Sequence, residues 1–306
     1  MNSTSRIVAL GTFDGVHRGH QTLLKYAVQV NQQNASTAVF TFDIPPEHYF
    51  TGKTKLLVDF ATKQKLIMET GIQEIAWVSF TKEFAALSAE DFIIQVLINH
   101  LKAKHLVCGF DYRFGAQAQG DYHLLQKFGK QYGFEVSVIA ADEWDGIPVS
   151  STRIRNALEA GNVELAATLL GRYHSYFGMI TAGKQIGREL GFPTANLQVN
   201  PGLLIPKTGV YFTWCYLPDG TSYPAMTSVS NNPTVNGKET TIESYLIGFE
   251  GDLYGKTVEL QFLEKIREII RFPEIEQLKA QLHDDKAYVL SKLPNYHLQA
   301  NRIMLK

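Results

Sequence analysis

The sequence predicts two domains of different classes: a Rossmann-like α/β domain built on a parallel sheet, then an antiparallel β-barrel with a terminal helix. The 306 residues are enough for two ordinary domains. In the first half, short apolar runs alternate with longer amphipathic ones, whereas much of the second half consists of short β-like runs separated by Gly, Pro, Asn and Asp. The pattern changes near residues 171–175, so we expect one domain over 1–172 and another over 173–306.

The first half is predicted to alternate buried strands with amphipathic helices. This alternation is typical of a parallel sheet with helices on both faces. Ligands of such sheets bind at the carboxyl ends of the strands, so we expect a site in the loop that follows the first strand. The expected strands are 7–10, 38–42, 75–80, 105–108 and 134–140, and the expected helices are 20–30, 62–69, 89–101 and 122–132.

The second half is predicted to be a small antiparallel barrel or a sandwich. Two helices, 152–159 and 163–170, come before the change of pattern. After Pro273 an amphipathic helix carries Ile275, Leu278 and Leu282 on one face, and we expect this helix to close the barrel. The clearest β-like runs are 210–216, 240–247 and 257–262.

The composition favours a folded globular protein of the cytoplasm. Hydrophobic residues make up 45% of the chain and charged residues 19%, with a formal net charge of −1. No basic block predicts a nucleic-acid partner, and no apolar run approaches the ~20 residues that span a membrane. Cys108 and Cys215 lack metal-ligand or redox spacing, so we expect buried free thiols in a reducing compartment. The sequence carries no signal for the oligomeric state.

The stretch 11–20, Gly-Thr-Phe-Asp-Gly-Val-His-Arg-Gly-His, follows the first predicted strand and opens the first predicted helix. His17 and His20 are three residues apart and would project from nearly the same face of that helix. Free N–H groups at a helix start favour an anion, and two imidazoles there would stabilise charge that develops on a triphosphate. Gly19 would let a nucleotide approach the backbone closely. Taken alone, the two histidines are explained equally well as surface or capping residues.

A second motif, Val-Ser-Ser-Thr-Arg-Ile-Arg at 149–155, also stands at a predicted helix start. Ser150 can cap that helix, while Ser151 and Thr152 offer donors to phosphate oxygens. Arg155 can hold phosphate as a cationic fork. The alternative is an ordinary capped helix with exposed arginines. Because both motifs occur at strand-to-helix junctions of one chain, together they favour a phosphate site.

The two motifs resemble those of the His-x-Gly-His nucleotidyltransferase superfamily, and the wording is closer still to the bacterial bifunctional riboflavin kinase/FAD synthetase (FMN adenylyltransferase) family. Segments 84–92 and 108–115 are also similar to that family, and the likeness runs almost end to end. It implies an α/β nucleotidyltransferase fold, transfer of AMP from ATP to FMN, catalytic roles for His17 and His20, and Asp111 near the phosphates or Mg²⁺. The nucleotide-binding residues expected in this half are Gly11, Phe13, Asp14, Gly19, Asp111, Ser151, Thr152 and Arg155. One departure is the stretch 42–46, which lacks the His of the family's Phe-x-Pro-His-Pro.

In the second half, the stretch 183–197 has three glycines ahead of Thr194 and Asn196, which is typical of a phosphate and Mg²⁺ cradle. The alternative is a barrel loop that is rich in glycine for turning. The stretch is similar to the riboflavin kinase signature, which implies that Thr194 and Asn196 bind Mg²⁺ and ATP. The same resemblance implies that Glu243 is the catalytic base. The nucleotide-binding residues expected here are Gly183, Lys184, Gly187, Thr194 and Asn196.

The kinase half departs more from the family pattern than the first half does. The family's Glu-x-His reads Glu243-Ser-Tyr245, its Asp beyond the following Leu is Gly248, and its Asn-x-Gly reads Ser228-Val-Ser230. The prediction is a bifunctional enzyme that makes FMN from riboflavin and FAD from FMN, with ATP as co-substrate and Mg²⁺ as cofactor. The alternatives are an FAD synthetase with a weak or inactive kinase, a non-catalytic flavin sensor, and adenylyl transfer to another small phosphate.

Overall fold

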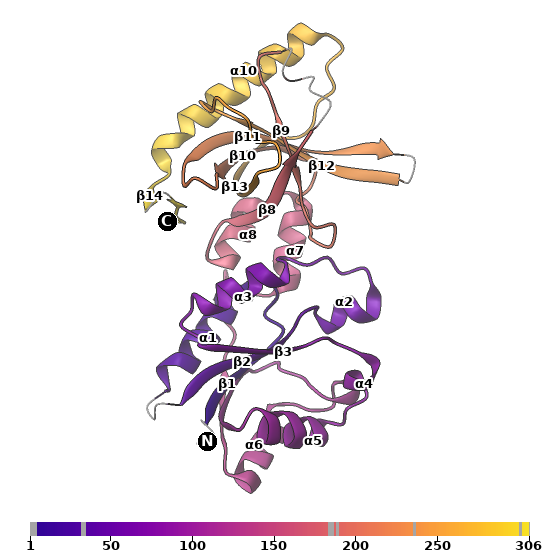
Figure 1. Ribbon diagram of the computed structural model, residues 1–306, viewed down its shortest axis with the longest axis vertical. Helices are drawn as coiled ribbons and strands as arrows, with labels where there is room; N and C mark the ends of the chain where they lie inside the picture. Colours follow the sequence, from indigo (N-terminus) through magenta and orange to yellow (C-terminus); the bar gives the residue numbers. More distant parts are fainter. Residues whose placement is uncertain are drawn as a thin grey trace. The chain divides into compact units, whose positions relative to one another are not determined.

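The computed structural model describes residues 5–31, 35–182, 187, 190–234, 237–299 and 302–305. The chain forms two compact units, Met1–Ser151 and Thr152–Lys306 (Figure 1). The second unit therefore contains α7 (Ser151–Ala160) almost entirely, together with α8 (Val163–Leu170) and the β-rich part of the chain. The predicted functional boundary at 172/173 differs from this division by contacts and stays a prediction.

A five-stranded parallel sheet forms the centre of the first unit, as predicted. Its order is β3-β2-β1-β4-β5, so the strand that precedes the His-x-Gly-His motif lies in the middle. Every neighbouring pair is parallel. The strands are β1 (Arg6–Leu10), β2 (Ser36–Phe42), β3 (Glu74–Val78), β4 (Ala103–Gly109) and β5 (Glu135–Ile139).

Helices cover both faces of this sheet, and β1 shows why. Alternate residues of a strand point to opposite faces. Ile7 and Ala9 pack in one apolar cluster with α1 (Arg18–Gln29) and α3 (Phe60–Met68). Val8 and Leu10 pack in another cluster with the helical segment after residue 88 and with α6 (Tyr122–Tyr132). In Figure 1, α1 and α3 lie on one side of the sheet, with α5 and α6 on the other.

The helix predicted at 89–101 is not a regular α-helix. It begins as α5 (Ala89–Asp91), where the Ser88 hydroxyl accepts the Asp91 N–H at 3.0 Å, and continues as a π-helix over Phe92–His100. Hydrophobic periodicity does not distinguish the two helix types. The sequence also missed several short elements, which fall below the length at which periodicity is informative; in the first unit these include α2 (Pro46–Thr51), α4 (Lys82–Ala85), β6 (Glu143–Trp144) and β7 (Ile147–Pro148).

The second unit is a closed antiparallel barrel, which decides between the predicted barrel and sandwich. Its order is β10-β11-β12-β9-β8-β13, and β13 pairs back onto β10. Two short strands, β14 (Leu298–Gln299) and β15 (Arg302–Ile303), pair near the chain's end. The barrel strands are β8 (His174–Thr181), β9 (Ala195–Gln198), β10 (Gly209–Tyr216), β11 (Ser222–Thr234), β12 (Gly237–Leu246) and β13 (Thr257–Arg267).

The terminal helix α10 (Ile275–Lys292) covers the barrel but does not close it, which corrects the prediction. The β10–β13 hydrogen bonds already close the sheet, so the helix has only a face to bury. Leu278 and Leu282 pack on an apolar cluster at that face, whereas Ile275 is 59% exposed. The Asp285 carboxylate accepts from Arg267 of β13, with Nη2 and Oδ2 at 2.7 Å, and so fixes the helix to the barrel.

Candidate functional site

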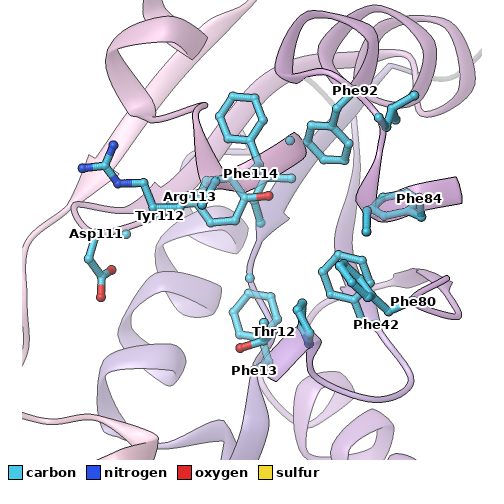
Figure 2. Close-up of a pocket in the computed structure, with 18 of the residues that line it drawn as sticks. Thr12, Phe13, Phe42, Phe80, Phe84, Phe92, Asp111, Tyr112, Arg113 and Phe114 are labelled. Atoms are coloured by element: carbon cyan, nitrogen blue, oxygen red, sulfur yellow. The ribbon is translucent and has the colours of Figure 1, made fainter. Parts of the chain in front are cut away.

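A cavity of about 490 Å³ opens at the carboxyl ends of the central strands of the first unit. This is the edge at which parallel sheets bind ligands, and the volume lies in the usual range for small-molecule sites. Four of the predicted site residues line it: Gly11, Phe13, His20 and Asp111. Asp111 and Arg113 lie on the side of the cavity opposite Phe42, Phe80 and Phe84 (Figure 2).

Aromatic rings form one wall of this cavity. The Phe42 ring lies 5.3 Å from that of Phe80 and 5.5 Å from that of Phe84, both edge to face, and Phe92 lies 5.3 Å from Phe114. Such a wall suits a flat heteroaromatic ring, which gains apolar burial and favourable ring contacts there. The sequence analysis missed the wall. Its only signal was the chain's 18 phenylalanines, which sequence alone does not bring together.

The two motif histidines lie together at the start of α1. Their rings stack at 3.6 Å between centroids with an interplanar angle of 19°. His17 is the N-cap residue of α1, and its Nδ1 accepts the backbone N–H of His20 at 3.4 Å. Because Nδ1 accepts, the neutral His17 ring carries its proton on Nε2, which is then a donor. The capping contact fixes the His17 ring through Nδ1, so it is compatible with the predicted catalytic role of this residue.

Gly19 packs closely against the capping imidazole. A Cβ at this position would lie 3.3 Å from Cε1 of His17 and 3.4 Å from its Nδ1. A side chain there would need the imidazole to move by a few tenths of an ångström. The glycine thus leaves room for the His17 ring, and the close approach of a nucleotide at this position stays a prediction.

Hydrogen bonds fasten the loop between β1 and α1 from behind. Asp14 is buried, and its Oδ1 accepts the backbone N–H of Leu57 at 3.1 Å. The Ser151 hydroxyl donates to the backbone carbonyl of Asp14 at 2.9 Å. Both residues were predicted to bind nucleotide, and the structure gives both a part in holding the loop. Thr152 and Arg155 lie three residues apart on α7 in the second unit, where Arg155 is buried, and their contact with ATP stays a prediction.

The barrel brings the predicted kinase residues together on one face. Glu243 of β12 is directly opposite Asn196 of β9, and opposite residues of antiparallel strands project to the same side. The Thr194 hydroxyl donates to Oε2 of Glu243 at 3.5 Å. On its other flank Glu243 is paired with Ser228 of β11, and Tyr245 follows two positions later on the same face. Both departures from the family pattern therefore adjoin the predicted base.

Two cavities of the barrel meet at Thr194. One, of about 600 Å³, is lined by Pro193, Ser244 and the loop 249–254. The other, of about 270 Å³, is lined by Glu243, Ser228, Tyr245 and apolar residues of α10, and Gly187 also belongs to it. A hydroxyl and a carboxylate thus stand where two ligands could meet. Gly183 and Lys184 lie outside the described residues.

The cysteines are buried free thiols, as predicted. Burial raises the pKa of Cys108 to about 12 and that of Cys215 to about 12, so neither is a nucleophile at neutral pH. The described part of the chain contains no cluster of three or more His, Cys, Asp and Glu side chains suited to a metal ion. In that same part, every helix is too short or too polar to cross a membrane.

Comparison with known proteins divides the chain in the same two halves. A family model described as FAD synthetase matches residues 1–153, and one described as riboflavin kinase matches residues 170–293. The bifunctional riboflavin kinase/FMN adenylyltransferase of Haemophilus influenzae is 36% identical over 281 residues, 91% of each chain. The one from Buchnera aphidicola is also 36% identical, over 97% of this chain and 96% of its own. A crystal structure described as a macrolide-efflux protein from Streptococcus pneumoniae superposes with a TM-score of 0.88 at 32% identity, covering 95% of both chains.

Proposed function

The chain belongs to the bifunctional riboflavin kinase/FMN adenylyltransferase family of flavin nucleotide biosynthesis, and we propose that each unit supplies the groups for one of the two reactions. The observation that carries the proposal is the stacked pair of His17 and His20, with His20 in the wall of a cavity that is aromatic on its other side. A flavin ring suits the aromatic side, and phosphates suit the imidazoles and the free N–H groups of the helix start.

In the adenylyl transfer, a phosphate oxygen of FMN attacks the α-phosphorus of ATP. A new P–O bond forms, the bond from that phosphorus to the β-bridging oxygen breaks, and pyrophosphate leaves with the electron pair. No protein nucleophile is needed, so the site acts by positioning and by stabilising charge. His20, and His17 through Nε2, supply donors to the phosphate oxygens on which charge grows. Phe42, Phe80 and Phe84 hold the isoalloxazine ring.

In the kinase reaction, Glu243 accepts the proton of the terminal ribityl hydroxyl while that oxygen attacks the γ-phosphorus of ATP and ADP leaves. A primary hydroxyl is a weak nucleophile until its proton is taken, which is the task of a positioned carboxylate. Thr194, at the meeting point of two cavities, suits the junction of riboflavin and ATP. We assign riboflavin to the smaller apolar cavity under α10 and ATP to the larger one.

Magnesium fits the donor set of the barrel site. Mg²⁺ prefers oxygen ligands, and Thr194, Asn196 and Glu243 offer hydroxyl, amide and carboxylate oxygens on one face. Thr194 and Asn196 would hold the ion together with ATP. When bound, it supplies positive charge to the phosphates. The chain's own groups then orient ATP and take the hydroxyl proton.

We also propose that the adenylyltransferase module extends to residue 172, past the compact unit that ends at Ser151. The support is the motif at 149–155, because Thr152 and Arg155 fall on α7, beyond that unit. A fragment of residues 1–172 should make FAD from added FMN and ATP. A folded but inactive fragment, beside an active full chain, would argue against the boundary.

We place the enzyme in the cytoplasm, where ATP is available and buried free thiols such as Cys108 stay reduced.

A second candidate, an FAD synthetase with a weak kinase, is favoured by the position of Ser228 and Tyr245 beside Glu243. One experiment separates the candidates: the protein is incubated with Mg²⁺-ATP and either riboflavin or FMN, and the flavins are separated by chromatography. FMN and FAD from riboflavin support two activities. If FAD forms from FMN but riboflavin is not converted, the single-function enzyme is supported. Neither product, with flavin still bound, supports a sensor.

A further inference from the structure

Lys63 is a buried lysine directly behind the adenylyl-transfer site. It lies on α3, and only 3% of its surface is exposed. Its Nζ donates to the backbone carbonyl of Phe42 at 2.5 Å and to that of Thr12 at 3.3 Å. Thr12 belongs to the loop after β1, and Phe42 ends β2. One ammonium group therefore ties together the two chain segments from which the histidine loop and the aromatic wall begin.

Two carboxylates and one aromatic ring lie near this buried ammonium group. The charged groups that face it are the carboxylates of Asp14, from the loop after β1, and Asp43, from the residue after β2. The Phe60 ring lies 5.3 Å from Nζ. Burial lowers the pKa of Lys63 to about 8, against the two carboxylates, which act to raise it. Fully buried lysines are rare because removing the charge from water is costly, and such groups gather at functional sites.

The fold has a neutral donor at the same place. The Thr41 hydroxyl also donates to the Thr12 carbonyl, at 3.0 Å. That carbonyl would therefore keep a partner if Lys63 were replaced. A side chain of similar length without charge, such as methionine, would fill the same volume. What the ammonium adds to the Thr41–Thr12 contact is a bond to the Phe42 carbonyl, which is a further tie between two segments that both line the cavity.

We propose that Lys63 is a positioning residue for adenylyl transfer, which sets the spacing between the histidine loop and the aromatic wall by holding the carbonyls of Thr12 and Phe42. The role rests on the proposed function of the first unit. Lys63 does not line the cavity, so it acts through these two residues and not on the substrates. Because transfer depends on positioning, a displacement of about 1 Å is enough to cost on the order of 10²-fold in rate.

The test compares Lys63→Met with Lys65→Met, an exposed lysine two positions along the same helix. FAD formation from FMN and FMN formation from riboflavin are measured in the same preparations, with melting temperature as the fold control. Lys63→Met should lower kcat for FAD formation by at least about tenfold and raise KM for FMN, with kinase kcat and KM unchanged. Lys65→Met should match the wild type in all of these. A folded Lys63→Met with FAD formation within about twofold of the wild type overturns the role.

If Lys63→Met does not fold, the role of Lys63 is tested instead on the wild type, from the pH dependence of FAD formation. Charge-assisted hydrogen bonds are about twice as strong as neutral ones, so losing the proton of Lys63 weakens both contacts. The kcat/KM for FMN should fall as pH rises through about 8, with no such fall for riboflavin phosphorylation. A profile for FMN that is flat to about pH 9 overturns the role. A wild type that makes no FAD from FMN and ATP removes the proposed function itself, which is a distinct result.

Discussion

The two sites of this chain are built by different means. In the sheet unit, the predicted site residues Gly11, Phe13, His20 and Asp111 follow the carboxyl ends of β1 and β4, and buried polar contacts such as Leu57 N–H to Asp14 hold the loop after β1. In the barrel, Asn196, Glu243 and Ser228 stand in a row across three neighbouring strands, and the hydrogen-bond register alone aligns them.

This difference teaches where each site is vulnerable. A loop site depends on residues outside the cavity wall that support it, such as Asp14 and, as proposed above, Lys63. The barrel site depends mainly on the few side chains of one strand face. The strand register that aligns them is set by the whole barrel, so a single substitution on that face should not change it. Two of the departures from the family pattern in the kinase half, Ser228 and Tyr245, fall on that face. The comparison therefore predicts local, separable effects in the barrel and more widely distributed effects in the sheet unit.

The largest effect is expected for Glu243→Gln. Glutamine keeps the size of the side chain and can still pair with Thr194, but it cannot accept the proton of the ribityl hydroxyl. Riboflavin phosphorylation should fall by about 10²–10⁴-fold, while FAD formation from added FMN stays intact. The rates are measured separately with riboflavin and with FMN. Clear wild-type kinase activity that survives unchanged in the Gln variant would remove Glu243 as the base.

His20→Ala should have the opposite selectivity. The imidazole stabilises charge that grows during transfer, so its loss should cost on the order of 3–4 kcal/mol, or about a hundred- to a thousandfold in FAD formation. FMN formation should not change, and ATP binding should change much less than the rate. An unaltered rate of FAD formation in a folded His20→Ala protein would exclude this histidine from the mechanism.

Phe50→Ala tests whether the aromatic wall binds the flavin. Phe50 lines the cavity and is 67% exposed, so its removal should disturb the core little. Loss of one ring contact of about 1 kcal/mol should raise KM for FMN roughly fivefold, with kcat for FAD formation nearly unchanged. Tyr132→Ala, a partly exposed aromatic of α6 that is not in the cavity wall, is the matched control. Equal KM values for the two variants would contradict a flavin role for the wall.

The smallest effect is expected for Ser228→Asn, which restores the family residue directly opposite Glu243. The amide can donate to the carboxylate across the strands and hold it for the hydroxyl proton. We expect riboflavin phosphorylation to rise about two- to fivefold, less than 1 kcal/mol of barrier. Ser230→Asn, two positions along the same strand, should leave the rate unchanged. A gain in both variants, or in neither, would show that the departure at Ser228 does not limit the kinase.

Much of the fold was predictable because its signals are local. The strand after Arg6 and the helix 122–132 each follow from short-range patterning. The failures also have a physical cause. Ile275 fits the apolar stripe of α10 but lies at the start of that helix, where the barrel no longer covers it, and the π-helix at 92–100 has the same apolar spacing as an α-helix.

The sequence by itself determined the two fold classes, the family, and the motifs that carry His17, His20, Thr194 and Glu243, because these depend on the order of residues along short stretches of chain. Only the tertiary structure decided that seven phenylalanines and one tyrosine meet around one cavity, that Asp14 and Ser151 support a loop, and that Ser228 lies opposite Glu243. These facts depend on which distant segments become neighbours. Strand order and register set those neighbours, and both are fixed by burial across the whole sheet rather than by any one stretch of residues.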